Sequence, residues 1–217
     1  MAAKSTALTL SSAAPAKRKS FRATPQNIVM QQVAQLWNTL DAITQGGWQT
    51  LADTTVAPTV QGVRTNATAY GRFYAHNSTL INAEAPAVTI APKTPSVQPL
   101  PPVRLVITYN GSTPELLLFP NTPYPYNVII QGAKPLYAGQ NAYKKGAFKK
   151  IGALNGISLT TDITALYLSK YRLPTSGYQV ALKLIGVSPD GTRTPPLFVT
   201  AIAISSGTGS APALTIE

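Results

Sequence analysis

Residues 177–205 read GYQVALKLIGVSPDGTRTPPLFVTAIAIS, two runs of β-branched and apolar residues with a turn between them. The turn, Ser188-Pro189-Asp190-Gly191, combines the residue types that favour a tight reversal of the chain. The pattern predicts a β-hairpin whose two strands are residues 177–187 and residues 197–205.

Five further runs of the same kind precede this hairpin. They read VRLVITY (103–109), ELLLF (115–119), YNVIIQG (126–132), ISLTT (157–161) and ALYLSKY (165–171). Short strands separated by turn residues, over about 105 residues, are typical of an immunoglobulin-like or fibronectin-III-like antiparallel β-sandwich. We therefore expect a sandwich over residues 103–205, followed by a flexible tail rich in Gly, Ser and Ala at residues 206–217.

Upstream of residue 86 the spacing of apolar residues changes to three and four, which indicates helices. A first helix is predicted to begin at Thr24-Pro25, because Thr is a good N-cap and Pro is tolerated at the first helical position. Its apolar stripe runs from Ile28 to Ile43. Thr44 is then expected to cap a second helix.

The two glycines at Gly46-Gly47 predict a bend, and a third helix is expected from about Asn66 until Pro86. These helices can bury their stripes against one another with aromatic rings as the main packing mass, rather than form a ligand cage. The sequence thus predicts an α+β protein with a helical module over residues 24–85. The rings expected to pack this module are Trp37, Trp48, Tyr70 and Phe73.

Two segments are expected to be extended. Residues 86–102, PAVTIAPKTPSVQPLPP, are rich in proline, and this composition predicts a stiff linker between the module and the sandwich. Residues 1–23 hold five cations and no acid, and they have too few large apolar residues to fold alone. We expect a flexible basic arm whose candidate contacts with a polyanion or a partner are Lys17, Arg18, Lys19 and Arg22.

The composition restricts the classes of function. The chain has 18 Lys and Arg against 7 Asp and Glu, a net charge of +11, which favours polyanions or acidic proteins as partners. Only 12% of its residues are charged, about half the usual fraction, which suits a protein that works inside an assembly. The absence of cysteine excludes disulfides and thiolate metal sites. No signal peptide or spanning segment is apparent, so we expect synthesis in the cytoplasm and no membrane contact.

A second basic segment, AYKKGAFKKIG, covers residues 142–152. Its lysines are Lys144, Lys145, Lys149 and Lys150, and we expect them on a loop of the sandwich. The loop could grip nucleic acid, or it could be solvated or contact protein. Phe148 alone is a thin platform for stacking bases, so the basic arm is the stronger candidate for polyanion contact.

The residues needed for catalysis are sparse. The chain has a single histidine, His76, with no carboxylate nearby in sequence to orient it, and its seven acids are scattered. It has no phosphate-binding loop, nucleophile elbow or zinc-ligand spacing. We therefore predict no catalytic, cofactor-binding or metal-binding residues and expect the protein not to be an enzyme.

The stretches LWNTLDAITQGGWQTLAD (36–53) and TAYGRFYAHNSTLINAEAP (68–86) resemble an uncharacterised group of proteins from phages, prophages and bacterial genomes. The group shares a Leu-Trp pair, a second Trp about eleven residues on, and an aromatic-rich helix with Phe-x-x-x-Asn. The matching residues are Leu36, Trp37, Trp48, Leu51, Tyr70, Phe73 and Asn77. Before the second Trp the group usually carries an acidic or Gln-Arg run, whereas this chain has Thr44-Gln45-Gly46-Gly47.

The resemblance implies a proline-rich connector, a fibronectin-like sandwich and a structural role in a virion. We therefore expect a non-enzymatic structural protein of a virus particle of the tailed-phage type, associated with the head, connector or tail. Its partners would be other virion proteins, further copies of itself, and packaged nucleic acid through the arm.

Two other functions stay open. A nucleic-acid-binding protein would use the basic arm together with the Lys144–Lys150 segment. A surface adhesin or glycan-binding sandwich would need exposed aromatic residues clustered at one end of the sandwich.

Overall fold

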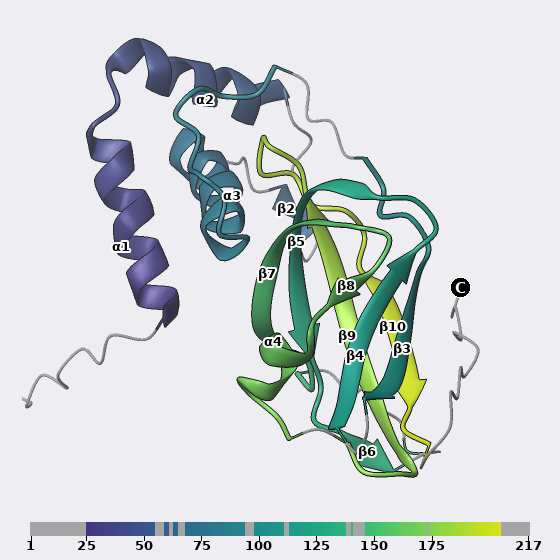
Figure 1. Ribbon diagram of the computed structural model, residues 1–217. Helices are drawn as coiled ribbons and strands as arrows, with labels where there is room; N and C mark the ends of the chain where they lie inside the picture. Colours follow the sequence, from purple (N-terminus) through teal and green to yellow (C-terminus); the bar gives the residue numbers. More distant parts are fainter. Residues whose placement is uncertain are drawn as a thin grey trace, which may run out of the picture.

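The structure, a computed structural model, combines three N-terminal helices with two antiparallel sheets that face each other, which confirms the predicted α+β class and β-sandwich (Figure 1). It describes residues 25–54, 59–60, 63–64, 68–93, 98–110, 113–137, 140, 146–172 and 174–204. The predicted arm at residues 1–23 and the predicted tail at residues 206–217 lie outside the described residues.

The helical module contains α1 (Pro25–Asn38), α2 (Ala42–Thr54) and α3 (Ala69–Asn82). The prediction that Thr44 caps the second helix is wrong. Asp41 is the capping residue, because its side-chain Oδ1 accepts a hydrogen bond of 2.7 Å from the Thr44 backbone N–H. This bond lowers the pKa of the Asp41 carboxyl below its ordinary value.

The glycines Gly46-Gly47 do not interrupt the helix, since both lie within α2. A glycine inside a helix costs about 1 kcal/mol relative to alanine. The Asp41 cap and the complete burial of Trp48 on the next turn oppose that cost. Between α2 and α3 a short ribbon pairs β1 (Thr59–Val60) with β2 (Val63–Arg64).

The third helix has a clear start and a clear end. The Thr68 side chain caps it by accepting a 3.0 Å bond from the backbone N–H of Gly71. The helix ends at Asn82, and Glu84 then takes a left-handed conformation with φ 58°, which turns the chain toward the sandwich.

The sandwich is built from eight described strands. They are β3 (Val103–Asn110), β4 (Thr113–Pro120), β5 (Tyr124–Gly132), β6 (Leu136–Tyr137), β7 (Lys149–Ile157), β8 (Thr161–Asp162), β9 (Tyr178–Val187) and β10 (Leu197–Ile202). One sheet has the order β10-β9-β5-β7, with β6 paired to the start of β9, and the other has the order β3-β4-β8.

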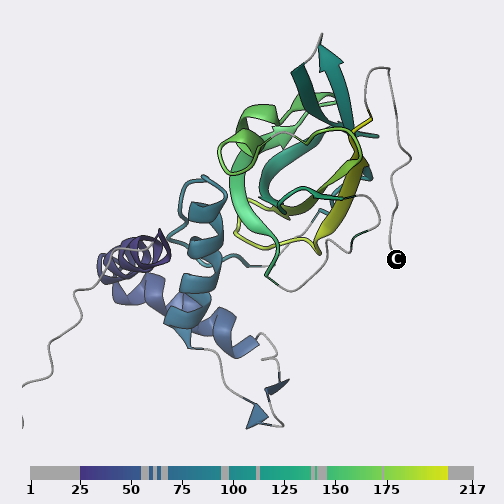
Figure 2. The same cartoon turned by 90° about the horizontal axis from the view of Figure 1, so that it is seen from below.

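Strand β5 is buried on both of its faces. Val128 and Ile130 point into the main core between the two sheets. Ile129, which points the other way, packs with Ile185 of β9 and Leu80 of α3 in a second cluster on the outer face of the sheet. The helical module therefore lies against the sandwich, and Figures 1 and 2 both show α3 as the helix nearest to it.

Three sequence predictions within the sandwich are wrong. The predicted strand at residues 157–161 is instead the connection between two strands, because β7 ends at Ile157 and β8 begins at Thr161. The segment predicted as a strand at residues 165–171 forms instead α4 (Thr164–Leu168) and a turn, and this places the Tyr167 ring in the main core. Residues 149–157 form β7, which was not predicted. Its Gly152 leaves a gap in the apolar pattern, and a Cβ there would lie 2.7 Å from the end of the Leu166 side chain.

The first part of the proline-rich segment packs on the helices. The indole N–H of Trp48 donates a 2.7 Å bond to the Thr89 carbonyl. The Asn77 side chain donates to the Val88 carbonyl at 3.0 Å and accepts from the Val88 N–H at 2.7 Å. These contacts attach residues 88–89 to the module, so this part of the segment does not stand free as a spacer.

Candidate interaction sites

Of the lysines predicted to lie on a loop, Lys149 and Lys150 are described, and they are the first two residues of β7. The prediction of a loop is wrong for these two. Lys144 and Lys145, like Lys17, Arg18, Lys19 and Arg22 of the arm, lie outside the described residues.

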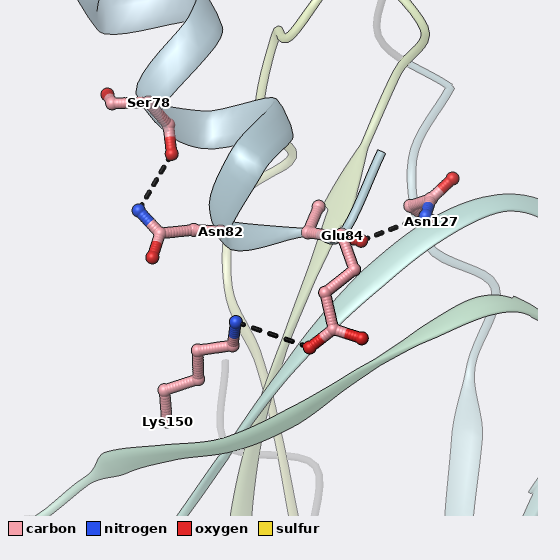
Figure 3. Close-up of polar contacts among 6 residues, drawn as sticks. Ser78, Asn82, Glu84, Asn127 and Lys150 are labelled. Atoms are coloured by element: carbon pink, nitrogen blue, oxygen red, sulfur yellow. Dashed lines mark hydrogen bonds and ion pairs between the residues drawn. The ribbon is translucent and has the colours of Figure 1, made fainter. Parts of the chain in front are cut away.

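Lys150 contacts the end of the helical module (Figure 3). Its Nζ lies 3.5 Å from Oε1 of Glu84, the residue that turns the chain after α3. The two side chains are 36% and 64% exposed, so water screens the pair and its contribution is at most about 1 kcal/mol. The ion pair lies where the module meets the sheet, but it contributes little to the stability of that contact.

Hydrogen bonds to backbone groups reinforce the same place. The side-chain amide of Asn127 on β5 donates a 2.9 Å bond to the Ala83 carbonyl, and Figure 3 shows it reaching the turn from the sheet. Within α3, Asn82 donates to the Ser78 carbonyl at 2.7 Å. The last turn of α3 is thus tied both to itself and to the sheet.

The turn after β9 makes the remaining contacts with α3. The ring nitrogen Nδ1 of His76 lies 2.6 Å from the Asp190 carbonyl oxygen, which can only accept, so Nδ1–H donates. The guanidinium Nε of Arg193 donates a 2.7 Å bond to Oγ1 of Thr79. We call these contacts, with those of Glu84 and Ala83, the joint.

Close backbone approach fixes the joint sterically. Gly191 has φ 84°, and a Cβ at this position would lie 2.6 Å from the carbonyl oxygen of His76. Only glycine meets both conditions without strain. The single histidine thus orders a contact between the two parts of the chain, where the sequence offered no partner for it.

The four aromatic residues predicted to pack the module lie around one another. The rings of Trp48 and Phe73 are completely buried and meet edge to face with centroids 5.2 Å apart. Trp37 packs on the same Phe73 ring at 5.1 Å and on Tyr70 at 5.7 Å. These residues form the core of the module, and no cavity described in the structure opens between them.

A different group of cations lines a cavity of about 610 Å³ at the end of the sandwich farthest along β9 from the joint. We call it the basic cavity. Its lining residues are Lys134, Pro135, Lys170, Tyr171, Arg172, Pro174, Thr175 and Tyr178. They come from three places in the chain: the segment after β5, the turn after α4 and the turn that leads into β9.

Hydrogen bonds and ring contacts fix the walls of the basic cavity. The Tyr171 hydroxyl donates a 3.0 Å bond to the Gly132 carbonyl, and burial raises the pKa of this hydroxyl. Behind it, the buried Tyr167 hydroxyl donates to the Ala133 carbonyl at 2.9 Å. The two tyrosine hydroxyls thus fix the backbone of Gly132 and Ala133, the two residues before Lys134.

The other wall is formed by a tight turn. The backbone N–H of Tyr178 donates a 3.1 Å bond to the Thr175 carbonyl, and Gly177 between them has φ 84°. A left-handed residue at this position is what a type II turn requires. The Tyr178 ring meets Tyr137 of β6 edge to face at 5.4 Å, so it is braced on one side and exposed on the other.

The charge in the basic cavity is of one sign. Three of its lining residues are cations and none is an acid. Within the part of the chain that the structure describes, the ion pair found is Lys150–Glu84, and it involves none of these three cations. The positive charge at this end is therefore not neutralised by the described residues.

The sequence contains a signal for this site in Lys170-Tyr171-Arg172, where the apolar pattern predicts only the end of a strand. Tyr178 follows this tripeptide closely, but Lys134 is far from it in sequence, and the pairing of β5 and β6 with β9 brings Lys134 to it. No sequence pattern could have assembled the group.

Three further observations concern metal sites, membrane spans and similarity to known proteins. Among the described residues no group of three His, Asp or Glu side chains could hold a metal ion. None of the described helices has the length and hydropathy to cross a bilayer. The chain matches no protein-family model, no curated protein and no solved structure.

Proposed function

We propose that this protein is a non-enzymatic structural subunit of a virus particle, of the tailed-phage type, and that it acts through protein–protein assembly. The observation that carries the proposal is an apolar groove on the helical module. This groove has a volume of about 590 Å³ between α2 and residues 90–93, and none of its lining residues belongs to the sandwich.

Two isoleucines on the groove are unusually exposed for their type. Ile43 is 88% exposed and Ile90 is 78% exposed. Covering one such side chain contributes about 1.5–3 kcal/mol, and large apolar side chains gathered at one place on a surface commonly mark a contact with another protein. Two such side chains on one apolar groove therefore support a contact with another subunit.

Further features support a role in assembly. The joint and the apolar cluster beneath it fix the module on the sandwich, so that the groove is held in one position relative to the sheets. The low fraction of charged residues suits a protein surrounded by other proteins. The resemblance of residues 36–53 and 68–86 to phage and prophage proteins favours a virion as the assembly.

The test is mass spectrometry of purified particles from cells that carry the gene. The proposal predicts the protein in the particles at many copies, and its absence from them would contradict the proposal. The groove is tested by exchanging Ile43→Glu and Ile90→Glu together, which should lower incorporation. Leu159→Glu is the matched control, because Leu159 is a 58% exposed apolar residue of the sandwich and should leave incorporation unchanged.

A further inference from the structure

The basic cavity is large enough for a ligand rather than for a single ion. Its volume of about 610 Å³ falls in the range of binding sites for small molecules. One phosphate or sulfate group would fill only a small part of it. A ligand that fits therefore carries further atoms beside its charge.

The cations determine the sign of that charge. Lys134, Lys170 and Arg172 are exposed and reach the cavity from two separate segments, with no acid among the lining residues to oppose an anion. Cations of this kind bind phosphates by releasing the counterions that surround a polyanion. Arg172 adds a planar fork that can bond two oxygens of one phosphate.

The aromatic residues determine the shape of the rest of the ligand. The Tyr178 ring packs against Tyr137 and lines the cavity. The hydrogen-bonded turn before it fixes the Tyr178 backbone. The Tyr171 ring is held by its own hydroxyl bond to Gly132. Tyr171 is half-buried against the main core, whereas Tyr178 offers an exposed face. A rigid, exposed aromatic face beside cations is the arrangement that proteins use to stack the bases of single strands.

An acidic sugar would suit the charge but not the walls. Sugar hydroxyls need several neutral or acidic hydrogen-bonding side chains, and Thr175 is the one lining residue of that kind besides the two tyrosines. The Tyr171 hydroxyl already donates to the backbone. Pro135 and Pro174 complete a largely apolar wall, which suits the flat face of a base better than a ring of hydroxyls.

We propose that the basic cavity binds a nucleotide unit of a single-stranded nucleic acid, with its phosphate on Lys134, Lys170 and Arg172 and its base against Tyr178. This site is separate from the apolar groove of the proposed assembly function and from the basic arm. It gives the protein a second kind of partner at the opposite end of β9 from the joint.

The test is fluorescence anisotropy of the full-length protein with a labelled oligothymidylate of about ten nucleotides, at about 50 and 200 mM salt. Exchanging Lys170→Gln and Arg172→Gln together should weaken binding and flatten the slope of log affinity against log salt by about 0.7 for each phosphate that is no longer bound. The control pair, Lys93→Gln with Arg104→Gln, removes the same charge from exposed residues outside the cavity and should change the slope less.

The base contact has its own variants. Tyr178→Leu should weaken binding roughly tenfold, and Tyr178→Phe should retain it, because the ring rather than the hydroxyl stacks. Circular dichroism confirms that each variant is folded. The arm is present in every variant and contributes the same background to all of them.

Three outcomes would overturn the proposal. The first is an equal loss of affinity in the cavity pair and the control pair, which would mean attraction to the overall charge. The second is unchanged binding by Tyr178→Leu. The third is competition by free thymidine monophosphate or by a sulfated oligosaccharide as strong as that of unlabelled oligothymidylate, since the site would then not be one for a nucleic acid strand.

Discussion

The two ends of strand β9 use positive charge in different ways. Beyond its last residue, Arg193 donates to Thr79 of α3, and Lys150 of the neighbouring strand β7 pairs with Glu84. At its first residue, Tyr178, the basic cavity holds Lys170 and Arg172 beside no acid. The comparison shows that one group of cations serves contacts inside the chain, while no acid lines the cavity that holds the other.

The difference also shows what holds the helical module in place. The ion pair at the joint is exposed and contributes little. Apolar packing of Leu80 against Ile129 and Ile185, and the close approach of Gly191 to His76, are the contacts that demand one geometry. We therefore expect steric and apolar changes at the joint to matter more than changes of charge.

The largest effect is expected for Trp48→Ala, which removes the centre of the module behind the joint. A completely buried Trp costs about 3–5 kcal/mol when it is truncated, and the hydrogen bond to the Thr89 carbonyl is removed as well. Chemical denaturation followed by circular dichroism measures the change. Trp37→Ala is the control, because Trp37 is only partly buried, and an equal loss in both variants would contradict this view of the module.

The next effect is expected for Gly191→Ala. The left-handed conformation strains any residue with a Cβ, and here the Cβ would also press on the His76 carbonyl, so we expect a loss of about 2–4 kcal/mol. Gly146→Ala is the matched control, because Gly146 has φ 85° but a Cβ there would meet nothing within 4 Å. If both variants unfold at the same denaturant concentration, the contact with His76 has no role in stability.

Tyr167→Phe tests the wall behind the basic cavity and should cost about 1–3 kcal/mol, because it leaves the buried Ala133 carbonyl without its donor. Burial also raises the pKa of Tyr167 well above the ordinary value of about 10. The stability that depends on its proton is therefore present below pH 10 and is lost as the pH rises toward the higher pKa of the folded state.

Tyr167→Phe lacks the titrating hydroxyl, so the free energy of unfolding of this variant should fall less steeply above pH 10 than that of the wild type. Thermal unfolding between about pH 8 and pH 11 measures the difference. A difference in stability between the wild type and Tyr167→Phe that stays constant over this range would show that the Tyr167 hydroxyl does not titrate as proposed.

The smallest effects test the comparison of charges directly. Arg193→Gln should cost about 1 kcal/mol, because it removes the hydrogen bond to Thr79. Arg172→Gln should change the free energy of unfolding by less than about 0.5 kcal/mol, since Arg172 holds no partner in the described chain and lies among like charges. Equal losses of unfolding free energy in the two variants would remove the distinction between the cations of the joint and those of the basic cavity.

The sequence predicted the parts of the fold that have a strong local pattern. The hairpin of residues 177–205 and the runs in β3, β4 and β5 alternate clearly enough to be recognised as strands. Strand β7 is hard to recognise in the sequence because Gly152 and Gly156 interrupt its apolar pattern. The segment of α4 is rich in apolar and aromatic residues, which also suit a strand. The hydrogen bond from the Tyr167 hydroxyl to the Ala133 carbonyl joins residues distant in sequence, so the local pattern does not show it.

The candidate site was harder to predict than the fold. The predicted lysines at 149 and 150 do lie together, but the pairing partner of Lys150 is Glu84, which is distant in sequence and belongs to the helical module. Strand pairing brings residues 134–135 to residues 170–178 at the basic cavity. Charge patterns in sequence show where cations are dense, whereas only the fold shows which of them are satisfied.

The most direct test of the contrast between the basic cavity and the joint is heteronuclear NMR of the full-length protein during titration with unlabelled oligothymidylate. We expect shifts of the backbone amides of Lys134, Tyr171 and Tyr178 at the basic cavity, with no shift at Thr79 or Gly191 at the joint. Shifts at the joint, or an unchanged spectrum at the cavity when the strand is bound, would contradict the contrast between the two ends.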